Sequence, residues 1–488
     1  MNNNFIRGNL PFDDAGFHDM LKATNLTTLR YPGGTSGSLF DWETNQFVPN
    51  DILLSYGPKS WHRRHLEMKK RIAQAPPNTF SADNFAAMCK TLDIEPVWIP
   101  NPVTVTPQSN IKFFEHLKAN NIPCNFVEMG NECGGHAFRR IFPKGSDYAN
   151  AIRPVMKRIK EISPQAKIAV VANGHRIAQM KKSEEEQESG SANARGETWN
   201  DMLMADRQYF DAIVLHSYGV SPTQLRKYQP NQWQSLILAF PGAYMDAAAD
   251  RSRRLYHATP IWLSEYNAAF HHLMEARVRQ HDAAEDYFGK VSDSPMHGLM
   301  IASYMIGAIN DPQIWPIINY HSLTGPKGFR LVRRNEGDWR MGPKIQIFSY
   351  LAQLIRESQT MYPVNIQNAD SLNFTCFNND KPISTLAAAA LENDQQRHWL
   401  IMNRSNQTQT VRIPWQQSDK ATIRTIAGTL APKDPQTMWT LMTTIDTTQT
   451  PWDKPLTLKP VTAQRNNKQP HHSLSLEPHS LTVVSMPR

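Results

Sequence analysis

Two glutamates stand where short apolar runs of the sequence end. Glu132 closes the run NFVEMGNE, and Glu265 closes the run PIWLSE. A few apolar residues followed by an abrupt change to polar ones is typical of a strand buried in a parallel sheet. In parallel α/β folds, reactive side chains gather at the carboxyl ends of such strands. Two carboxylates there could cleave a glycosidic bond, one protonating the leaving oxygen and the other attacking the sugar carbon.

A single glutamate at a strand end more often serves as a helix cap or a surface ion-pair partner. The residue before Glu132 favours the catalytic interpretation, because Asn131 places an amide beside the acid. Such an amide can hydrogen-bond a sugar hydroxyl next to the bond being broken, and contacts to the 2-hydroxyl strengthen in the transition state.

Three further polar residues follow strand-like runs. Arg30 lies in RYPGGT, before a turn whose small residues let the backbone approach a ligand. Its guanidinium could pair with Glu265 and keep it ionised, although another barrel carboxylate would serve equally well. His216 and Tyr218, in LHSYG, end the run before that of Glu265. The tyrosine could orient the nucleophile, and the histidine could bond to the acid/base region.

The elements that must position these residues follow a repeating pattern. Eight strand-like runs can be counted, at 4–8, 27–31, 95–100, 125–129, 167–172, 212–216, 260–264 and 314–320. Segments with the apolar spacing of amphipathic helices lie between them, at 83–91, 111–120, 148–162 and 297–309. Eight alternating units over about 340 residues predict a (β/α)₈ TIM barrel. Glu132 would end its fourth strand and Glu265 its seventh.

The character of the sequence changes after about residue 345. FSYLAQLIRES predicts one last helix, and short alternating runs such as STLAAAAL, HWLIMNR, TVRIP, TIRTIAG, LTLKP and LTVVSMP follow it. This pattern is typical of an antiparallel β-sandwich. We therefore predict a catalytic barrel over residues 1–350 and a C-terminal β-sandwich over 351–488, which we expect to brace the barrel rather than to bind sugar.

Charge and composition limit the classes of partner. The 488 residues include Lys+Arg 52 and Asp+Glu 44, a net charge of +8. No nucleic-acid-binding motif occurs, so we expect no nucleic-acid partner. A basic patch at 62–65 lies in a long loop over 32–80, and the excess charge either favours an anionic substrate or only maintains solubility.

Other features concern the compartment and metals. The four cysteines lack metal-ligand spacing and are predicted to be free thiols, and no apolar run of about 20 residues predicts a membrane span. The start, MNNNFIRGNLPF, lacks signal-peptide features. The chain as it stands is therefore expected in the cytoplasm, or in the periplasm or outside the cell if a leader was removed. The oligomeric state stays open.

Taken together, the motifs resemble a known family. LRYPGGT, EPVWIPN, GNE, HSY, SEYN and LEPHSLTVVSM occur in this order. They are similar to glycoside hydrolases of clan A, above all the family 51 α-L-arabinofuranosidases, and also families 39, 79 and 86. The resemblance implies a retaining mechanism without metal or organic cofactor. Glu132 would be the general acid/base and Glu265 the nucleophile. Asn131 would bond the sugar 2-hydroxyl, Arg30 and Tyr218 would hold the nucleophile, and Asn101 would lie near the sugar.

The sequence also departs from the family 51 pattern. Thr35 stands where the arabinofuranosidases carry a sugar-contacting asparagine, and Ser264 and Tyr266 flank the nucleophile in place of aspartate and tryptophan. The substrate therefore stays open between an arabinofuranoside and a polymer of plants or algae, such as a marine galactan cleaved by an endo-acting β-glycanase. Trp61, Trp199 and Trp233 are candidates for stacking sugar rings, and packing beneath their own loops is the alternative.

Two hypotheses from other classes remain. One is a metal-dependent hydrolase using some of the 17 histidines, although no HExxH or comparable spacing occurs. The other is a sugar-binding protein on an inactivated glycosidase scaffold, against which the presence of both carboxylates argues.

Overall fold

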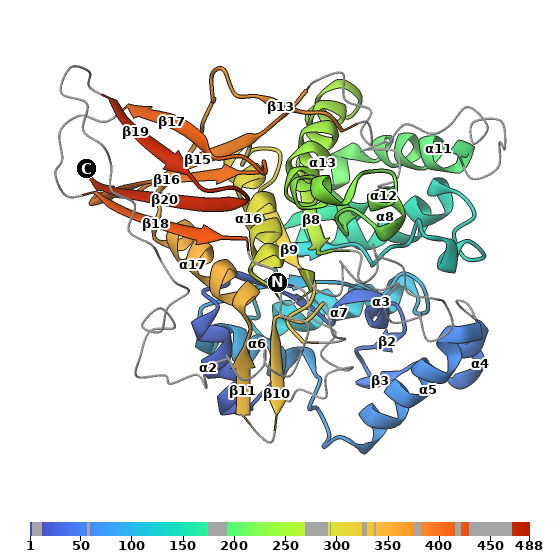
Figure 1. Cartoon of the computed structure of the whole chain (residues 1–488). Helices are drawn as coiled ribbons and strands as arrows, with labels where there is room; N and C mark the ends of the chain where they lie inside the picture. Colours follow the sequence, from blue (N-terminus) through green and yellow to red (C-terminus); the bar gives the residue numbers. More distant parts are fainter. Residues whose placement is uncertain are drawn as a thin grey trace.

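A computed structural model of the chain describes residues 1, 12–55, 59–173, 193–268, 291–292, 294–324, 329–335, 338–374, 382–414, 421–428 and 471–488. The blue-to-green half and the yellow helices form one body, against which the orange and red strands pack (Figure 1).

The first part of the chain is built around a curled parallel sheet. Its seven strands, in order of pairing, are β1 (Thr28–Tyr31), β4 (Glu95–Trp98), β5 (Phe126–Glu128), β6 (Lys167–Val171), β7 (Ala212–Ser217), β8 (Ile261–Tyr266) and β9 (Ile317–Tyr320). The first and last strands lie close to each other, as shown by the hydrogen bond of 2.8 Å that the Thr28 hydroxyl donates to the Asn319 side chain. The backbone of Met1 lies at this seam, where its carbonyl accepts from the Arg30 N–H at 3.0 Å. The sheet is therefore a nearly closed TIM barrel.

Seven of the eight predicted strands are confirmed, and the run at 4–8 lies outside the described residues. The strands are buried on both faces, as their continuous apolar runs predict. Inward-facing residues form a small apolar core inside the barrel, comprising Val97, Ala169, Ala212, Val214, Trp262 and Ile317. The alternate residues, such as Leu29, Val127, Ile213 and Leu263, join the larger core between the strands and the surrounding helices.

The barrel helices are α2 (Ala15–Ala23), α6 (Ala82–Leu92), α7 (Pro107–Ala119), α8 (Gly145–Ile162), α11 (Asn193–Met204), α13 (Trp233–Leu255), α16 (Pro295–Asn310) and α17 (Pro343–Glu357). The four predicted helices are confirmed as α6, α7, α8 and α16. Side chains of Ser81, Thr106 and Ser294 cap three of their N-termini, which satisfies backbone donors of the first turn.

Shorter elements decorate the carboxyl edge of the barrel. Between β1 and α6 lie α3 (Gly34–Gly37), β2 (Phe40–Asp41), β3 (Gln46–Phe47), α4 (Asn50–Ser55) and α5 (Lys59–Gln74). Further along the chain are α12 (Pro222–Leu225), β10 (Val332–Asn335) and β11 (Asp338–Met341). No helix among the described residues is both long and apolar enough to cross a membrane.

The C-terminal part is an antiparallel β domain, as predicted. A five-stranded sheet pairs β12 (Thr360–Pro363), β15 (Leu386–Glu392), β16 (Gln396–Asn403), β20 (Ser480–Pro487) and β18 (Thr422–Ala427) in that order. Two further pairs are β17 (Gln409–Pro414) with β19 (His471–Leu476), and β13 (Ser371–Leu372) with β14 (Ile383–Ser384). The run LTLKP at 456–460 lies outside the described residues.

The five-stranded sheet has two buried faces. One face shares a continuous core with the barrel, to which it contributes Ala389, Leu391, Leu400, Met402, Leu481 and Val483. The other packs against the β17–β19 pair through a separate core that includes Ile401, Ile413, Leu476 and Val484. Position 350 lies inside α17, so we propose that the junction follows Glu357.

The shared core leads to a prediction. Deleting residues 361–488 should give insoluble or unfolded protein, because α16 would lose the apolar sheet that covers it. Each buried aliphatic side chain contributes about 1.5–3 kcal/mol, so losing several exceeds a typical net stability of about 5–15 kcal/mol. Soluble yield and thermal melting measure this. A soluble, fully active barrel would contradict it.

Candidate active site

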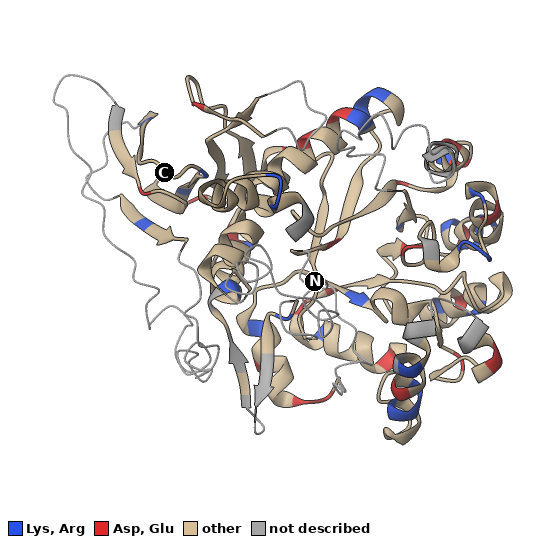
Figure 2. Cartoon of the chain, turned by 45° about the vertical axis from the view of Figure 1, so that its right-hand side comes forward, with Lys and Arg blue, Asp and Glu red and all other residues tan. Residues whose placement is uncertain are grey.

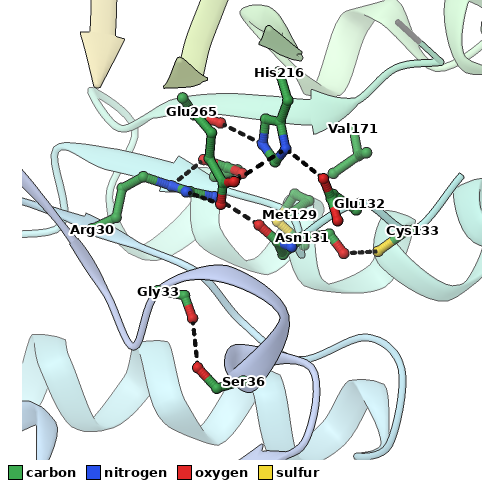
Figure 3. A network of polar contacts seen from close by, with 12 residues as sticks. Arg30, Gly33, Ser36, Met129, Asn131, Glu132, Cys133, Val171, His216 and Glu265 are labelled. Atoms are coloured by element: carbon green, nitrogen blue, oxygen red, sulfur yellow. Dashed lines mark hydrogen bonds and ion pairs between the residues drawn. The ribbon is translucent and has the colours of Figure 1, made fainter. Parts of the chain in front are cut away.

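Arg30 is the centre of a buried polar network at the carboxyl end of the barrel. Its fully buried guanidinium donates to Glu128 at 3.0 Å and 2.6 Å, to Glu265 at 2.9 Å and to the Asn131 side-chain oxygen at 3.1 Å. Figure 3 shows Arg30, Glu265 and Asn131 converging with His216 and Glu132. Charge-assisted, forked hydrogen bonds of this kind fix geometry as well as charge.

A β-bulge explains how Glu265 enters the network. Successive side chains of a strand alternate between facing inward and facing outward. Trp262 faces inward, so Ser264 faces inward too, and the same alternation would turn Glu265 outward. The pairing of β7 with β8 shifts after Leu215 and Leu263, so that His216 lies opposite Glu265. The extra residue re-aims the strand. As a result, Ser264 contacts His216 at 3.1 Å while Glu265 contacts Arg30.

The surroundings of Glu265 keep its carboxylate ionised. Its side chain is only 4% exposed, and burial alone would raise its pKa. Electrostatic interactions with His216, His321 and Arg30, together with a hydrogen bond from the Tyr218 hydroxyl, outweigh burial and hold the pKa of Glu265 well below its usual range. Burial and the same carboxylate raise the pKa of Tyr218, so the tyrosine remains a donor.

Glu132 lies across from Glu265 in a sharp loop after β5. Its backbone has a φ of 49°, in the left-handed region, and Gly130 two residues earlier has a φ of 96°. A Cβ at Gly130 would lie 2.7 Å from both Cys133 Sγ and the Pro102 ring, so this close turn requires glycine. The Glu132 side chain is 44% exposed, which leaves it accessible to water and to a leaving group.

His216 joins the two glutamates. One ring nitrogen lies 3.0 Å from a Glu132 oxygen and 3.6 Å from a Glu265 oxygen, and the other lies 3.1 Å from the Ser264 hydroxyl. Burial alone would lower the pKa of His216, but the charges of Glu265 and Glu132 raise it above its ordinary value. The imidazole therefore holds the two carboxylates at a fixed separation.

One ligating atom each from Glu132, His216 and Glu265 lies within 4.8 Å of the others. Such a group has the composition of a cation site. However, both Glu265 oxygens already accept hydrogen bonds, from Arg30 and from Tyr218, and the guanidinium charge lies 2.9 Å away. This fixed positive charge opposes a divalent ion, and the geometry instead suits two carboxylates acting on one bond.

The other predicted residues differ in their placement. The Asn131 side-chain nitrogen is buried without a hydrogen-bond partner among the described residues, so it can donate to a ligand. Thr35 is half-buried in α3, the short helix that follows β1. Asn101 is occupied by its own surroundings: it donates to the Phe40 carbonyl and the Thr104 hydroxyl, and its oxygen accepts two backbone N–H groups. These hydrogen bonds order the loop around Asn101, and its place near the sugar stays a prediction.

The candidate stacking residues favour packing. Trp199 is fully buried and donates to the Val171 carbonyl at 3.0 Å, and Trp233 is 6% exposed and donates to the Leu225 carbonyl at 2.9 Å. The Trp61 side chain lies outside the described residues. Cys89, Cys124 and Cys133 are buried free thiols, as predicted.

Two site residues escaped sequence reasoning. Glu128 is fully buried at the end of β5, four residues before Glu132. Because it lies two positions after Phe126 in the strand, the sequence could have predicted that both side chains face the inside of the barrel. His321 directly follows β9, and its ring lies beside those of Tyr218 and Phe329, with centroids 6.3 Å and 5.8 Å away. Burial lowers the pKa of His321. Its position directly after the last predicted strand could have identified His321 as a candidate site residue.

Sequence comparison finds no relative, since no family model and no curated protein matches the chain. Solved structures do match over nearly the whole length. A family 51 α-L-arabinofuranosidase from Bifidobacterium longum has a TM-score of 0.69 at 13% identity, covering 98% of this chain and 92% of that one. The α-L-arabinofuranosidase of Thermotoga maritima, in an arabinose complex, has a TM-score of 0.62 at 17% identity with the same coverage. The chain has a glycosidase fold.

A more distant structure shares the same architecture. A family 44 xyloglucanase from Paenibacillus polymyxa has a TM-score of 0.54 at 9% identity, covering 95% of this chain and 94% of that one. These neighbours share the predicted fold, a TIM barrel with a C-terminal β domain.

Proposed function

We propose that the chain is a retaining glycoside hydrolase. The observation that carries the proposal is the carboxylate pair: a Glu132 oxygen lies within 4.8 Å of a Glu265 oxygen across His216. Retaining enzymes place their carboxyl groups about 5–5.5 Å apart, whereas inverting enzymes leave about 6.5–9.5 Å for a water molecule. The spacing supports attack by a carboxylate.

The two carboxylates differ in ways that suit different roles. Glu265, buried and held ionised, is the proposed nucleophile: its oxygen bonds to the anomeric carbon as the bond to the leaving oxygen breaks, and Glu132 gives that oxygen a proton. Glu132 then takes a proton from water, whose oxygen attacks the same carbon and releases Glu265. Arg30 and Tyr218 hold the nucleophile, His216 holds both carboxylates, and the Asn131 amide donates to the sugar.

The experiment that tests this proposal is product stereochemistry. Aryl glycosides should be screened together with arabinan, agar, porphyran and uronate-containing polymers, and the first anomer released should be followed by proton NMR. Retention is the expected result. First release of the inverted anomer would overturn the mechanism, and sugar binding by calorimetry without cleavage would favour a non-catalytic role. Cleavage of aryl arabinofuranoside alone would favour an exo-acting arabinofuranosidase over a polymer-cleaving enzyme.

The charge around the carboxyl edge supports an anionic polymer as the substrate. α5 lies between β1 and α6, on the loop side of the barrel, and its sequence KSWHRRHLEMKKRIAQ has a single acidic residue. Blue bands mark this helix at the lower right of Figure 2. The Arg63 side chain is 92% exposed, and its pair with Glu67, at 3.7 Å, is too exposed to neutralise it. Arg139 and Arg140, also exposed, follow Glu132 in its own loop.

A charge-reversal experiment checks the anionic substrate. The variant Arg63→Glu/Arg139→Glu should raise KM for a sulfated or uronate-containing polymer by about tenfold at low salt, since each lost surface contact costs about 0.5–1 kcal/mol. Cleavage of a neutral aryl glycoside should be unchanged. The matched control is Lys118→Glu/Arg254→Glu, at exposed positions on the C-terminal ends of α7 and α13, at the opposite edge of the barrel. Equal effects of both double variants would contradict a local role.

A further inference from the structure

Glu128 is a buried carboxylate to which the proposed mechanism gives no role. It is the last residue of β5 and is 0% exposed. Both its oxygens accept from Arg30, one from Nη2 at 2.6 Å and the other from Nε at 3.0 Å. Such a two-point contact fixes the plane of the guanidinium, which a single hydrogen bond would leave free to rotate.

The orientation of that plane decides where two proposed site groups lie. Arg30 Nη1 donates to Glu265 at 2.9 Å, and Nη2 donates to the Asn131 side-chain oxygen at 3.1 Å. Because Asn131 accepts through its oxygen, its nitrogen points elsewhere, and this nitrogen is the buried donor that has no hydrogen-bond partner among the described residues. Glu128 thus orients the nucleophile and the sugar-binding amide through one shared cation.

Glu128 also divides the charge of Arg30. All three side chains are at most 4% exposed, so their interactions are weakly screened. If Glu265 alone received the guanidinium charge, its carboxylate would be held more strongly as an ion and would attack carbon less readily. A second carboxylate on the same cation leaves negative charge on Glu265 for the positive charge that develops on the sugar.

We propose that Glu128 is a positioning residue for the glycosylation step, acting through Arg30 on Glu265 and Asn131. The inference rests on the proposed glycosidase function. The alternative is a structural ion pair that merely fills the barrel, and breaking such a pair costs about 3–5 kcal/mol of stability without any effect on the chemistry.

The test is Glu128→Gln, which keeps the shape and removes the charge. In folded protein, quantified by active-site titration, we expect kcat for a substrate bearing the 2-hydroxyl to fall about 100-fold, with KM changed less than about threefold. The rate of trapping by the matching 2-deoxy-2-fluoro glycoside should fall less, since that sugar has no 2-hydroxyl for Asn131 to bond. A merely structural residue would lower the melting temperature and leave both rates per folded molecule unchanged, which would overturn the proposal.

Two controls sharpen the result. Glu392→Gln removes another buried carboxylate, which lies in β15 of the C-terminal sheet, is 4% exposed and pairs with Arg397 at 2.6 Å; it should lower stability and leave kcat unchanged. In a double-mutant cycle, the double variant Arg30→Lys/Glu128→Gln should lose little more kcat than Arg30→Lys alone, because both substitutions break the same contact. Fully additive losses would contradict action through Arg30.

If Glu128→Gln does not fold, Glu128→Asp provides the same comparison, because it keeps the charge and withdraws the carboxylate by one methylene. A folded Glu128→Asp enzyme with unchanged rates on both sugars would overturn the proposal. A wild-type chain that cleaves no glycoside would instead overturn the proposed function itself, so the two failures are distinguishable.

Discussion

Replacing Glu265 by alanine should abolish turnover, with kcat falling by about 10⁵-fold, because no water can occupy the position of the attacking carboxylate with the same geometry. Arg30 and Tyr218 would lose this acceptor, but Arg30 would keep its two hydrogen bonds to Glu128, so the fold should survive. The measurement is kcat on an aryl glycoside together with a thermal melt.

Azide distinguishes loss of the nucleophile from general damage. In Glu265→Ala the vacated space admits the anion, whose nitrogen attacks the anomeric carbon while Glu132 protonates the leaving oxygen. The product should therefore be the glycosyl azide of inverted configuration. A variant that keeps more than a few per cent of wild-type turnover would show that another group is the nucleophile.

Replacing Glu132 by alanine should give a loss that depends on the leaving group. An alkyl or sugar leaving group needs a proton, so kcat should fall about 10³- to 10⁴-fold, whereas a dinitrophenyl group leaves unaided and its glycosyl-enzyme should still form. The intermediate then accumulates, because no base activates water, and appears as a burst of released phenol. Steady-state and burst kinetics measure both effects.

Azide should act on Glu132→Ala in the opposite sense. It attacks the accumulated glycosyl-enzyme from the face that Glu132 occupied, so the glycosyl azide should have retained configuration. An inverted glycosyl azide from this variant would indicate that Glu132, rather than Glu265, is the nucleophile. Equal losses of kcat for alkyl and dinitrophenyl leaving groups would contradict the acid/base role of Glu132.

Much of this architecture is legible in the sequence because it depends on patterns of burial. The apolar run before Glu132 contains the buried strand β5, which ends at Glu128, and the run that includes Glu265 is the buried strand β8. The amphipathic spacing of 148–162 indicates a helix with one buried side. These patterns give the barrel, the β domain and the carboxylate pair, since strand ends of a parallel barrel meet at one edge.

Other parts of the site depend on backbone details that burial patterns do not encode. The backbone at Glu132 is left-handed, and the bulge before Glu265 shifts the pairing of β7 with β8 by one residue. The resemblance predicts Asn101 near the sugar, but it does not predict the four hydrogen bonds that the Asn101 side chain makes to neighbouring groups. Glu128 resembles any strand residue until the fold brings Arg30 to it from 98 positions away.

The bulge in β8 also bears on how relatives of this chain are recognised. Because an extra residue, rather than the two-residue repeat, brings Glu265 inside, the position of the proposed nucleophile depends on the register of the backbone. An alignment that treats β8 as regular would match Glu265 to an outward-facing residue of another barrel. At 9–17% sequence identity, a misalignment of one residue in β8 would hide the position that corresponds to Glu265. Aligning β8 by its pairing with β7, in which His216 lies opposite Glu265, would match Glu265 to the equivalent inward-facing residue.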